Sequence, residues 1–463
     1  RNRSIVTNFA STGGRYTRGE FSTVRVKGLN VPPFWQLQVP AANGGTRPVD
    51  ALLDNFMSIQ GVNAGVEGHE TCQRLHWQPV PGQQSRAEMA ADGSDAPMSA
   101  VNMDAITFAF KSDLDKSFVP LVFEDQNPLT VLLRPFLDRY PVANATLQSR
   151  LTAAGSALDA LAESWTPAAR ETRTNQNDAM VLLDRDFGDL NAIFQQRVVV
   201  YRSLIARSLS NNLVLPGFTD LPVGQTGSRD ALYNVNGNII ETPDMRDMFG
   251  AQATIFGLAE KMVVVEYLLR EDLCRSIVLG ARSMSGLTGA QNPVAEQDFD
   301  EHTTGMMASL IFNAKYYVAL SACLLELIDQ LKAANIFDDT VIEVGGEFGR
   351  TAIPDGSGSD HGWSGKNMSY YSGRFKGPTV LGNVYSTPPN NSGLEGYLGT
   401  WGHGAPVEGA GSTLSLNHET ASLATMLGVP SPTNAVDSLL TVDGDGRIVP
   451  AASVERARII RAA

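Results

Sequence analysis

A long helix-forming run is followed at once by a short apolar strand, and this order constrains the fold more than any other feature of the chain. Residues 306–335, MMASLIFNAKYYVALSACLLELIDQLKAAN, carry apolar side chains at helical spacing, whereas residues 340–346, TVIEVGG, form an apolar run of strand length. A second strand-like run, CRSIVLGAR at 274–282, precedes the helix. Parallel strands need a long crossover, so this order predicts a parallel βαβ unit and an α/β fold.

Three parts of the chain differ in their sequence pattern. Residues 1–130 are rich in Gly, Pro, Asn and Gln, and we expect them to form an irregular N-terminal part of the α/β domain. Residues 131–245 are expected to form a helical block, and residues 246–463 the C-terminal α/β part with a metal site. Within these parts we expect short strands at 22–29 and 34–40, and helices at 147–165, 178–209, 251–269 and 417–429, the last with Asn417 as its N-cap.

Charge and cysteine content exclude several classes of protein. The 463 residues carry a formal net charge of −13, which provides no positive surface for nucleic acid or for an anionic membrane. No apolar run reaches the roughly 20 residues that span a bilayer. Cys72, Cys274 and Cys323 provide neither a disulfide framework nor a CxxC metal knuckle, and Cys323 is expected to be a buried apolar residue of its helix.

Acidic residues and histidines gather where the predicted strands end. Glu347 directly follows the strand at 340–346, and Asp300 and His302 follow the earlier strand after a loop. Ligands of open parallel sheets bind at the carboxyl ends of the strands. We therefore expect these side chains at one edge of the sheet.

The adjacent residues Asp360 and His361 are expected on a loop that folds back over this edge. Together with Asp300 and His302 they supply the imidazole nitrogens and carboxylate oxygens that a divalent metal takes from separate loops. We expect zinc or calcium. For each pair, the alternative is an ordinary solvated loop.

Glu347 and Arg350 have two interpretations. A carboxylate next to a buried strand has to be paired or bound to a metal, because burying an isolated charge is costly. In the first interpretation, the two residues form a structural ion pair. In the second, Glu347 binds a metal and the guanidinium fork of Arg350 binds a phosphate or sulfate group.

Three motifs resemble those of the exported bacterial domain-of-unknown-function 1501 family, which is related to alkaline phosphatases and sulfatases. They are VIEVGGEFGRT, the following GSDHG and the downstream SGRFKGPTVLGNV. Members of that family carry an Asp-Thr-His element before a long helix, a Ser-Glu-Phe-Gly-Arg-Thr strand end and an Asp-His-Gly loop. Here Asp300 and His302 match the first element, Gly346 replaces the Ser of the second, and Asp360 and His361 match the third.

The resemblance implies an alkaline-phosphatase-like fold, with a mixed, mostly parallel sheet flanked by helices and a helical insertion. It also implies a periplasmic or extracellular location. The chain starts at Arg1, so we expect it to be either processed or incomplete, and processing of an export signal would fit this location. A metal position would be formed by Asp300, His302 and His361, with Glu347 remaining from a second position.

Two parts of the superfamily pattern are not recognisable. Phe348 stands where an intact two-metal enzyme would offer a histidine, and we identify no first strand before residue 60 that ends in an acid and leads to a Ser or Thr nucleophile. The nucleophile is therefore unassigned, because Ser58 and Thr71 have no supporting motif.

Other polar residues are secondary candidates or structural. His69, after Gly68, lies in a segment that loosely resembles one where the family often has a Ser-His pair, and His403 lies in a Gly-rich loop able to close over a site. We expect His418 to be structural. Asp443, in VDGDGR, is expected in a tight hairpin, with a calcium loop as the alternative.

Two functions remain open at this point. One is an exported, metal-binding hydrolase of a small phosphate or sulfate ester, which the acid and histidine set favours. The other is a non-catalytic surface or assembly protein that retains the fold, which the missing catalytic parts favour. Its partner would be a further copy of the chain, as a homo-oligomer or an assembly. Neither hypothesis includes nucleic acid or a membrane span.

Overall fold

A computed structural model describes the following residues: 24–65, 68–80, 82–94, 96, 100–103, 121–122, 149, 153, 156, 187–210, 232–233, 239–240, 249–280, 284–287, 306–352, 359–362, 364–382, 404, 406–407, 410 and 412–452. Helices and strands occur along the whole of this set, so the chain is an α/β protein. The described helices are α1 (His69–Trp77), α2 (Arg86–Ala91), α6 (Phe187–Ser210), α7 (Leu258–Arg270), α8 (Met306–Ala333) and α9 (Leu416–Leu427), with 3-10 helices η2 (Pro33–Gln36) and η3 (Val49–Asn55).

The strands are mostly short and form several small sheets. They are β1 (Val24–Val26), β2 (Leu29–Val31), β3 (Gln38–Pro40), β4 (Thr46–Pro48), β5 (Phe56–Asn63), β6 (Ala100–Met103), β7 (Leu121–Val122), β8 (Leu232–Tyr233), β9 (Ile239–Ile240), β10 (Phe249–Ile255), β11 (Ser276–Leu279), β12 (Met284–Leu287), β13 (Ile342–Gly345), β14 (Gly349–Ala352), β15 (Ser359–Gly362), β16 (Ser364–Tyr371), β17 (Thr379–Gly382), β18 (Leu440–Val442) and β19 (Ile448–Pro450).

The largest described sheet has four strands in the order β13-β16-β5-β17. Strand β16 is antiparallel to both β13 and β5, and β17 is parallel to β5. Strands β5, β13 and β17 therefore run in one direction and β16 runs in the other. A second sheet, β11-β6-β7, is entirely parallel.

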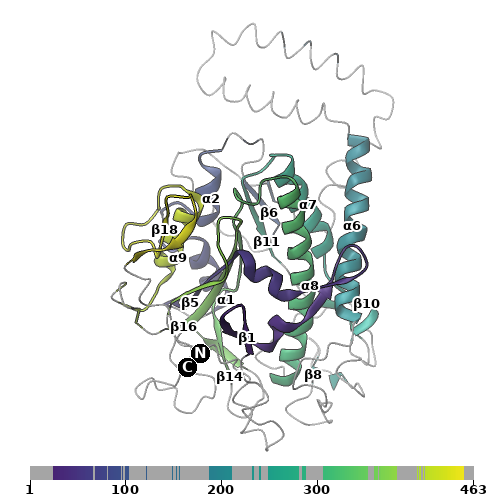
Figure 1. The fold of residues 1–463 in the computed structure, drawn as a ribbon, viewed down its shortest axis with the longest axis horizontal. Helices are drawn as coiled ribbons and strands as arrows, with labels where there is room; N and C mark the ends of the chain where they lie inside the picture. Colours follow the sequence, from purple (N-terminus) through teal and green to yellow (C-terminus); the bar gives the residue numbers. More distant parts are fainter. Residues whose placement is uncertain are drawn as a thin grey trace, which may run out of the picture.

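Helices cover both faces of the four-stranded sheet (Figure 1). Phe56 and Val380 belong to the core formed with α6, α7 and α8, whereas Met57 and Leu381 belong to a second core formed with α9. Successive residues of a strand point to opposite faces, which explains why neighbours enter different cores. The sheet is thus the middle layer between two sets of helices.

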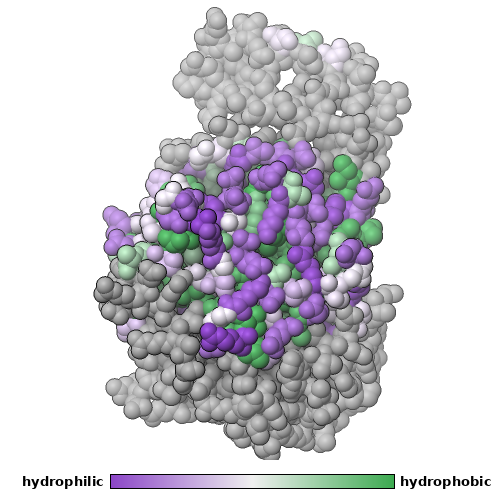
Figure 2. Space-filling model, in the orientation of Figure 1, coloured by the Kyte–Doolittle hydropathy of each residue, from purple (hydrophilic) through white to green (hydrophobic). Residues whose placement is uncertain are grey.

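Several sequence expectations are confirmed. The helix within 306–335 is α8, the strand within 340–346 is β13, and α6 occupies most of the helix expected at 178–209. Cys323 is fully buried in α8. Among the helices in the described parts, none has the length and apolar content needed to cross a bilayer. Polar residues make up most of the described surface on the face seen in Figure 2, with hydrophobic residues in narrow strips between them.

The prediction of a helix at 251–269 is wrong for its first residues, which form a strand. Strand β10 pairs with β12, and the helix α7 starts only at Leu258, after Gly257 adopts a φ of +64°. Ala253 and Ile255 are both buried, a spacing of two that fits a strand, and pairing outweighs the weak helix preference of this segment.

Two further expectations need correction. The N-cap of α9 is Ser415 and not Asn417, and the Ser415 N–H donates to His418 Nδ1 at 3.1 Å, which gives His418 the structural role expected of it. Strands β11 and β12 precede α8 in sequence and β13 follows it, but in the described pairings β11 pairs with β6, β12 with β10 and β13 with β16, in three separate sheets. The predicted βαβ unit is therefore not formed, because the strand after α8 pairs with β16 and not with the strand that precedes the helix.

We predict that Gly382→Ala destabilises the protein by about 2–5 kcal/mol. Gly382 has a φ of +96°, and an added Cβ would lie 2.0 Å from the Gln60 carbonyl oxygen of β5. Gly377 is a matched control, because it has a φ of +66° but open space around an added Cβ. Gly377→Ala should cost only about 1–2 kcal/mol, measured by urea unfolding. Equal losses in the two variants would contradict close packing of β17 on β5.

Candidate functional site

The carboxyl edge of the four-stranded sheet brings together two segments that are distant in sequence. Strand β5 ends at Asn63 and the chain enters α1 at His69, whereas β13 ends at Gly345 and the chain continues to Glu347. Because β5 and β13 run in the same direction, both segments leave the sheet at the same edge. The sequence singled out His69 and Glu347 separately, and the structure places them in contact.

Helix α1 holds both carboxylate oxygens of Glu347. His69 Nδ1 lies 2.5 Å from Oε1, and Gln73 Nε2 donates to Oε2 at 2.9 Å. The ring of Phe348 lies against the His69 ring, with 5.1 Å between the ring centroids. The His69 side chain is 49% exposed and that of Glu347 is 23% exposed, so the pair lies at the surface of the edge.

The segment after Glu347 forms a hairpin of β14 and β15. The pairing places Arg350 opposite His361 and Thr351 opposite Asp360. The expectation that Asp360 and His361 lie on a loop is therefore wrong: both are in β15, because that segment folds back and pairs with β14. The side chains of Arg350, Asp360 and His361 lie outside the described part of the chain.

Asp300, His302 and His403 fall outside the described residues. Among the side chains that the structure describes, no group of three or more His, Cys, Asp or Glu residues is arranged to hold a metal ion. An imidazole next to a carboxylate nevertheless fits the donor chemistry of a zinc site, of which it would form one part.

Strand β5 was missed from the sequence. No sequence pattern singled out Phe56–Asn63, which is an inner strand of the four-stranded sheet. It ends at Asn63 and not at an acid, and Ser58 is buried with its Oγ donating to the Met368 carbonyl. Ser58 is thus a structural residue. Polar residues within the strand obscure the apolar pattern that identifies buried strands.

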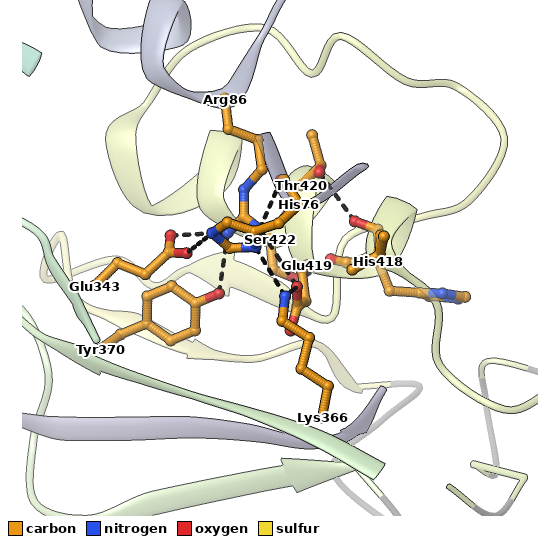
Figure 3. A network of polar contacts seen from close by, with 10 residues as sticks. His76, Arg86, Glu343, Lys366, Tyr370, His418, Glu419, Thr420 and Ser422 are labelled. Carbon is orange, nitrogen blue, oxygen red and sulfur yellow. Dashed lines mark hydrogen bonds and ion pairs between the residues drawn. The ribbon is translucent and has the colours of Figure 1, made fainter. Parts of the chain in front are cut away.

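A second group of charged residues is buried between the four-stranded sheet and α9 (Figure 3). We call it the buried charge cluster, and its members are His76, Arg86, Glu343, Lys366, Tyr370 and Glu419. The side chains of Arg86 and Glu419 are 0% exposed and that of Lys366 is 1% exposed. They come from α1, α2, β13, β16 and α9, so the cluster joins five elements.

The cluster pairs two cations with two carboxylates. Arg86 donates to Glu343 at 2.8 Å, to Glu419 at 3.3 Å and to the Tyr370 hydroxyl at 3.3 Å. Lys366 Nζ lies 2.8 Å from Glu419 Oε2 and 2.8 Å from His76 Nδ1. His76 Nε2 in turn lies 3.2 Å from Glu343 Oε1.

Burial and neighbouring charges shift the pKa values of the cluster. Burial, together with the positive charges of Lys366 and Arg86, lowers the pKa of His76 to about 4. Burial alone would raise the pKa of Glu343, but Arg86 and His76 outweigh it and lower the value to about 2. Burial also lowers the pKa of Lys366, against the opposing effect of Glu419. At neutral pH His76 is therefore an uncharged acceptor.

The cluster and the surface pair are connected by α1 and by β13. His69 and Gln73 in the first turns of α1 contact Glu347, and His76 in its last turn contacts Glu343. The contacts of His76 with Lys366 and Glu343 give it a structural role in the cluster. Arg86 and Lys366 had no sequence signal, because isolated basic residues are usually exposed.

Comparisons with protein-family models, with curated proteins and with solved structures find no match to this chain. The geometry of the site therefore carries the functional argument.

We predict that stability falls as the pH is lowered from neutral towards 4, in part through His76. The pKa of His76 is about 4 in the folded protein against the ordinary histidine value of 6.5 in the unfolded chain, so within this window only the unfolded chain takes up the proton. The contribution is about 3 kcal/mol. His76→Gln, which does not titrate, should lose about that much less stability between neutral pH and pH 4 in urea unfolding. Parallel pH profiles for the two proteins would contradict this.

We also predict that Lys366→Met destabilises the protein by about 3–5 kcal/mol, because Glu419 then lacks one of its two cationic partners. The double variant Lys366→Met/Glu419→Gln should recover part of this loss. Arg74→Ala is the control: its pair with Glu70 is exposed and should contribute less than about 1 kcal/mol. A loss in the double variant equal to the sum of the losses in Lys366→Met and Glu419→Gln would show that Lys366 and Glu419 are not coupled.

Proposed function

We propose that the chain is an exported, metal-binding protein that hydrolyses a small phosphate or sulfate ester at the carboxyl edge of its four-stranded sheet. The contact between His69 and Glu347 carries the proposal, because it joins the two segments that leave this edge. The edge of parallel strands is where α/β proteins place their ligands. The alkaline-phosphatase-like assignment is part of this proposal and rests on the motif resemblance.

The proposal assigns cation binding and ester binding to different residues at this edge. Imidazole and carboxylate groups at the edge hold a divalent cation, zinc or calcium, with Asp360 and His361 supplied by the hairpin next to Glu347. Asp300 and His302 are the further ligands expected from the motif resemblance. Arg350 in the same hairpin binds the anionic oxygens of the ester through its guanidinium fork. The bound cation would supply charge stabilisation of the ester and activation of the attacking oxygen.

The first test is metal content and turnover. Purified protein is dialysed against zinc or calcium, its metal content is measured by elemental analysis, and p-nitrophenyl phosphate and p-nitrophenyl sulfate are assayed. We expect bound metal and turnover of one of the two esters, both lost after chelation. Bound metal without turnover, with a loss of thermal stability on chelation, would favour the structural alternative instead.

We predict that His361→Ala lowers the metal content and the turnover together, because one ligand is removed. Glu70→Gln is the control: Glu70 is on α1, its side chain is 88% exposed and its partner is Arg74. That variant should retain both properties. Unchanged metal content in His361→Ala would remove His361 from the site.

A further inference from the structure

Helix α2 is short and almost completely buried between two parts of the fold. Ala87 packs against Trp77 and against Val278 of β11, whereas Met89 belongs to the core formed with α9. Arg86 points from the same helix into the buried charge cluster (Figure 3). Helix α2 thus joins the parallel sheet β11-β6-β7 to α9.

The carboxyl group of Glu88 on this helix is buried without a partner. Glu88 is 0% exposed, and neither of its carboxyl oxygens has a hydrogen-bond partner in the described part of the chain. Asp92, one turn later, is 6% exposed, and its Oδ2 accepts from Gln84 Nε2. Residues four apart share one face of a helix, so ionisation of Glu88 would place a second carboxylate beside Asp92. Burying such a charge is costly, which favours the uncharged acid.

Among the charged groups described around Glu88, Asp92 is the one that acts on it. Arg86 on α2 is engaged by the carboxylates of the buried charge cluster, to which Glu419 of α9 belongs. His418 of α9 accepts from the backbone at its N-cap, and burial lowers its pKa. Strands β6 and β11 carry no ionisable side chain. Burial, and then the charge of Asp92, raise the pKa of Glu88 to about 7.

We propose that Glu88 is a pH-sensitive switch that controls whether α2 stays packed between α9 and the parallel sheet. The uncharged acid fits the buried position, whereas the carboxylate needs water and favours an arrangement in which α2 has moved away from its neighbours. The ordinary pKa of glutamic acid is 4.5, so a released α2 loses the proton of Glu88 at a lower pH than a packed one. Release therefore becomes easier as the pH rises from 4.5 to about 7 and levels off above it.

The switch is connected to the sheet edge through Arg86. When α2 moves away, Glu343 and Glu419 lose a cationic partner. His76 of α1 contacts Glu343, so the change reaches the helix that carries His69. The proposal does not depend on a cation at that edge.

The first measurement is hydrogen–deuterium exchange of the full chain between pH 4.5 and about 8. Protection factors, which remove the intrinsic pH dependence of exchange, are compared for α2 and α8. Helix α8 reports changes in global stability, because its residues form much of the larger core. Relative to α8, the protection of α2 should fall on the order of 100-fold as the pH rises to 7.

Three variants identify the group that titrates. Glu88→Gln keeps the shape of the uncharged acid and cannot ionise, so α2 should keep its protection at every pH. Asp92→Asn removes the neighbouring charge but retains an acceptor for Gln84, so the fall should be smaller and should end at a lower pH. Glu70→Gln changes an exposed glutamate of α1 and should behave as the unaltered chain does.

Infrared spectroscopy of the unaltered chain tests the proposal even if Glu88→Gln does not fold. At about pH 6 ordinary glutamates are ionised, whereas Glu88 should still give the carbonyl band of a protonated acid. This band should disappear around pH 7, and at a lower pH in Asp92→Asn.

Three results would overturn the proposal. The first is protection of α2 that follows that of α8 at every pH, which would show that α2 is not released by itself. The second is an unchanged pH dependence in Glu88→Gln. The third is the absence of a protonated-acid band at about pH 6, which would show that Glu88 is ionised in its buried position.

Discussion

The buried charge cluster is the interaction on which the arrangement of the other elements depends. Arg86 and Lys366 are almost completely buried, and each contacts the fully buried carboxylate of Glu419. Charges removed from water are stable only when their partners are correctly placed. The positions of α2, β16 and α9 are therefore coupled, since a shift of any one of them leaves a charge without its partner.

This coupling extends to the surface through α1. Helix α1 contacts the β13 segment twice, at Glu343 inside the protein and at Glu347 at the edge. The inner contact is part of the cluster, whereas the outer contact forms the candidate site. A helix held at its buried end by charge pairing gives His69 and Gln73 a defined position at the other end.

Sequence reasoning identified the parts with strong local patterns and missed those that depend on tertiary contacts. The helix α8 and the strand β13 were predicted because they combine length with a clear apolar period. Strand β5 was missed because Ser58, Gln60 and Gly61 interrupt its apolar run. The first part of 251–269 was read as a helix because its pairing with β12 has no local signal.

In the candidate site too, individual residues were identified from local patterns, whereas their contacts were not. Glu347 was singled out because it directly follows an apolar run of strand length, and His69 because its segment loosely resembles a family motif. Their contact crosses 278 positions of sequence, so no local pattern predicts it. Asp360 and His361 were expected on a loop, since the glycines and serines before them resemble one, but pairing with β14 makes that segment a strand.

The alternation of side chains along β13 explains how the cluster also sets the site. Ile342 and Val344 pack against the core on the side of α8, whereas Glu343 points to the opposite face and enters the cluster. A slip of one residue would place Glu343 against the apolar core and Val344 among the charges. The cost of burying an unpaired carboxylate thus opposes any other register of β13. Since Glu347 is only four positions after Glu343, the register that satisfies the buried charges also brings Glu347 to His69.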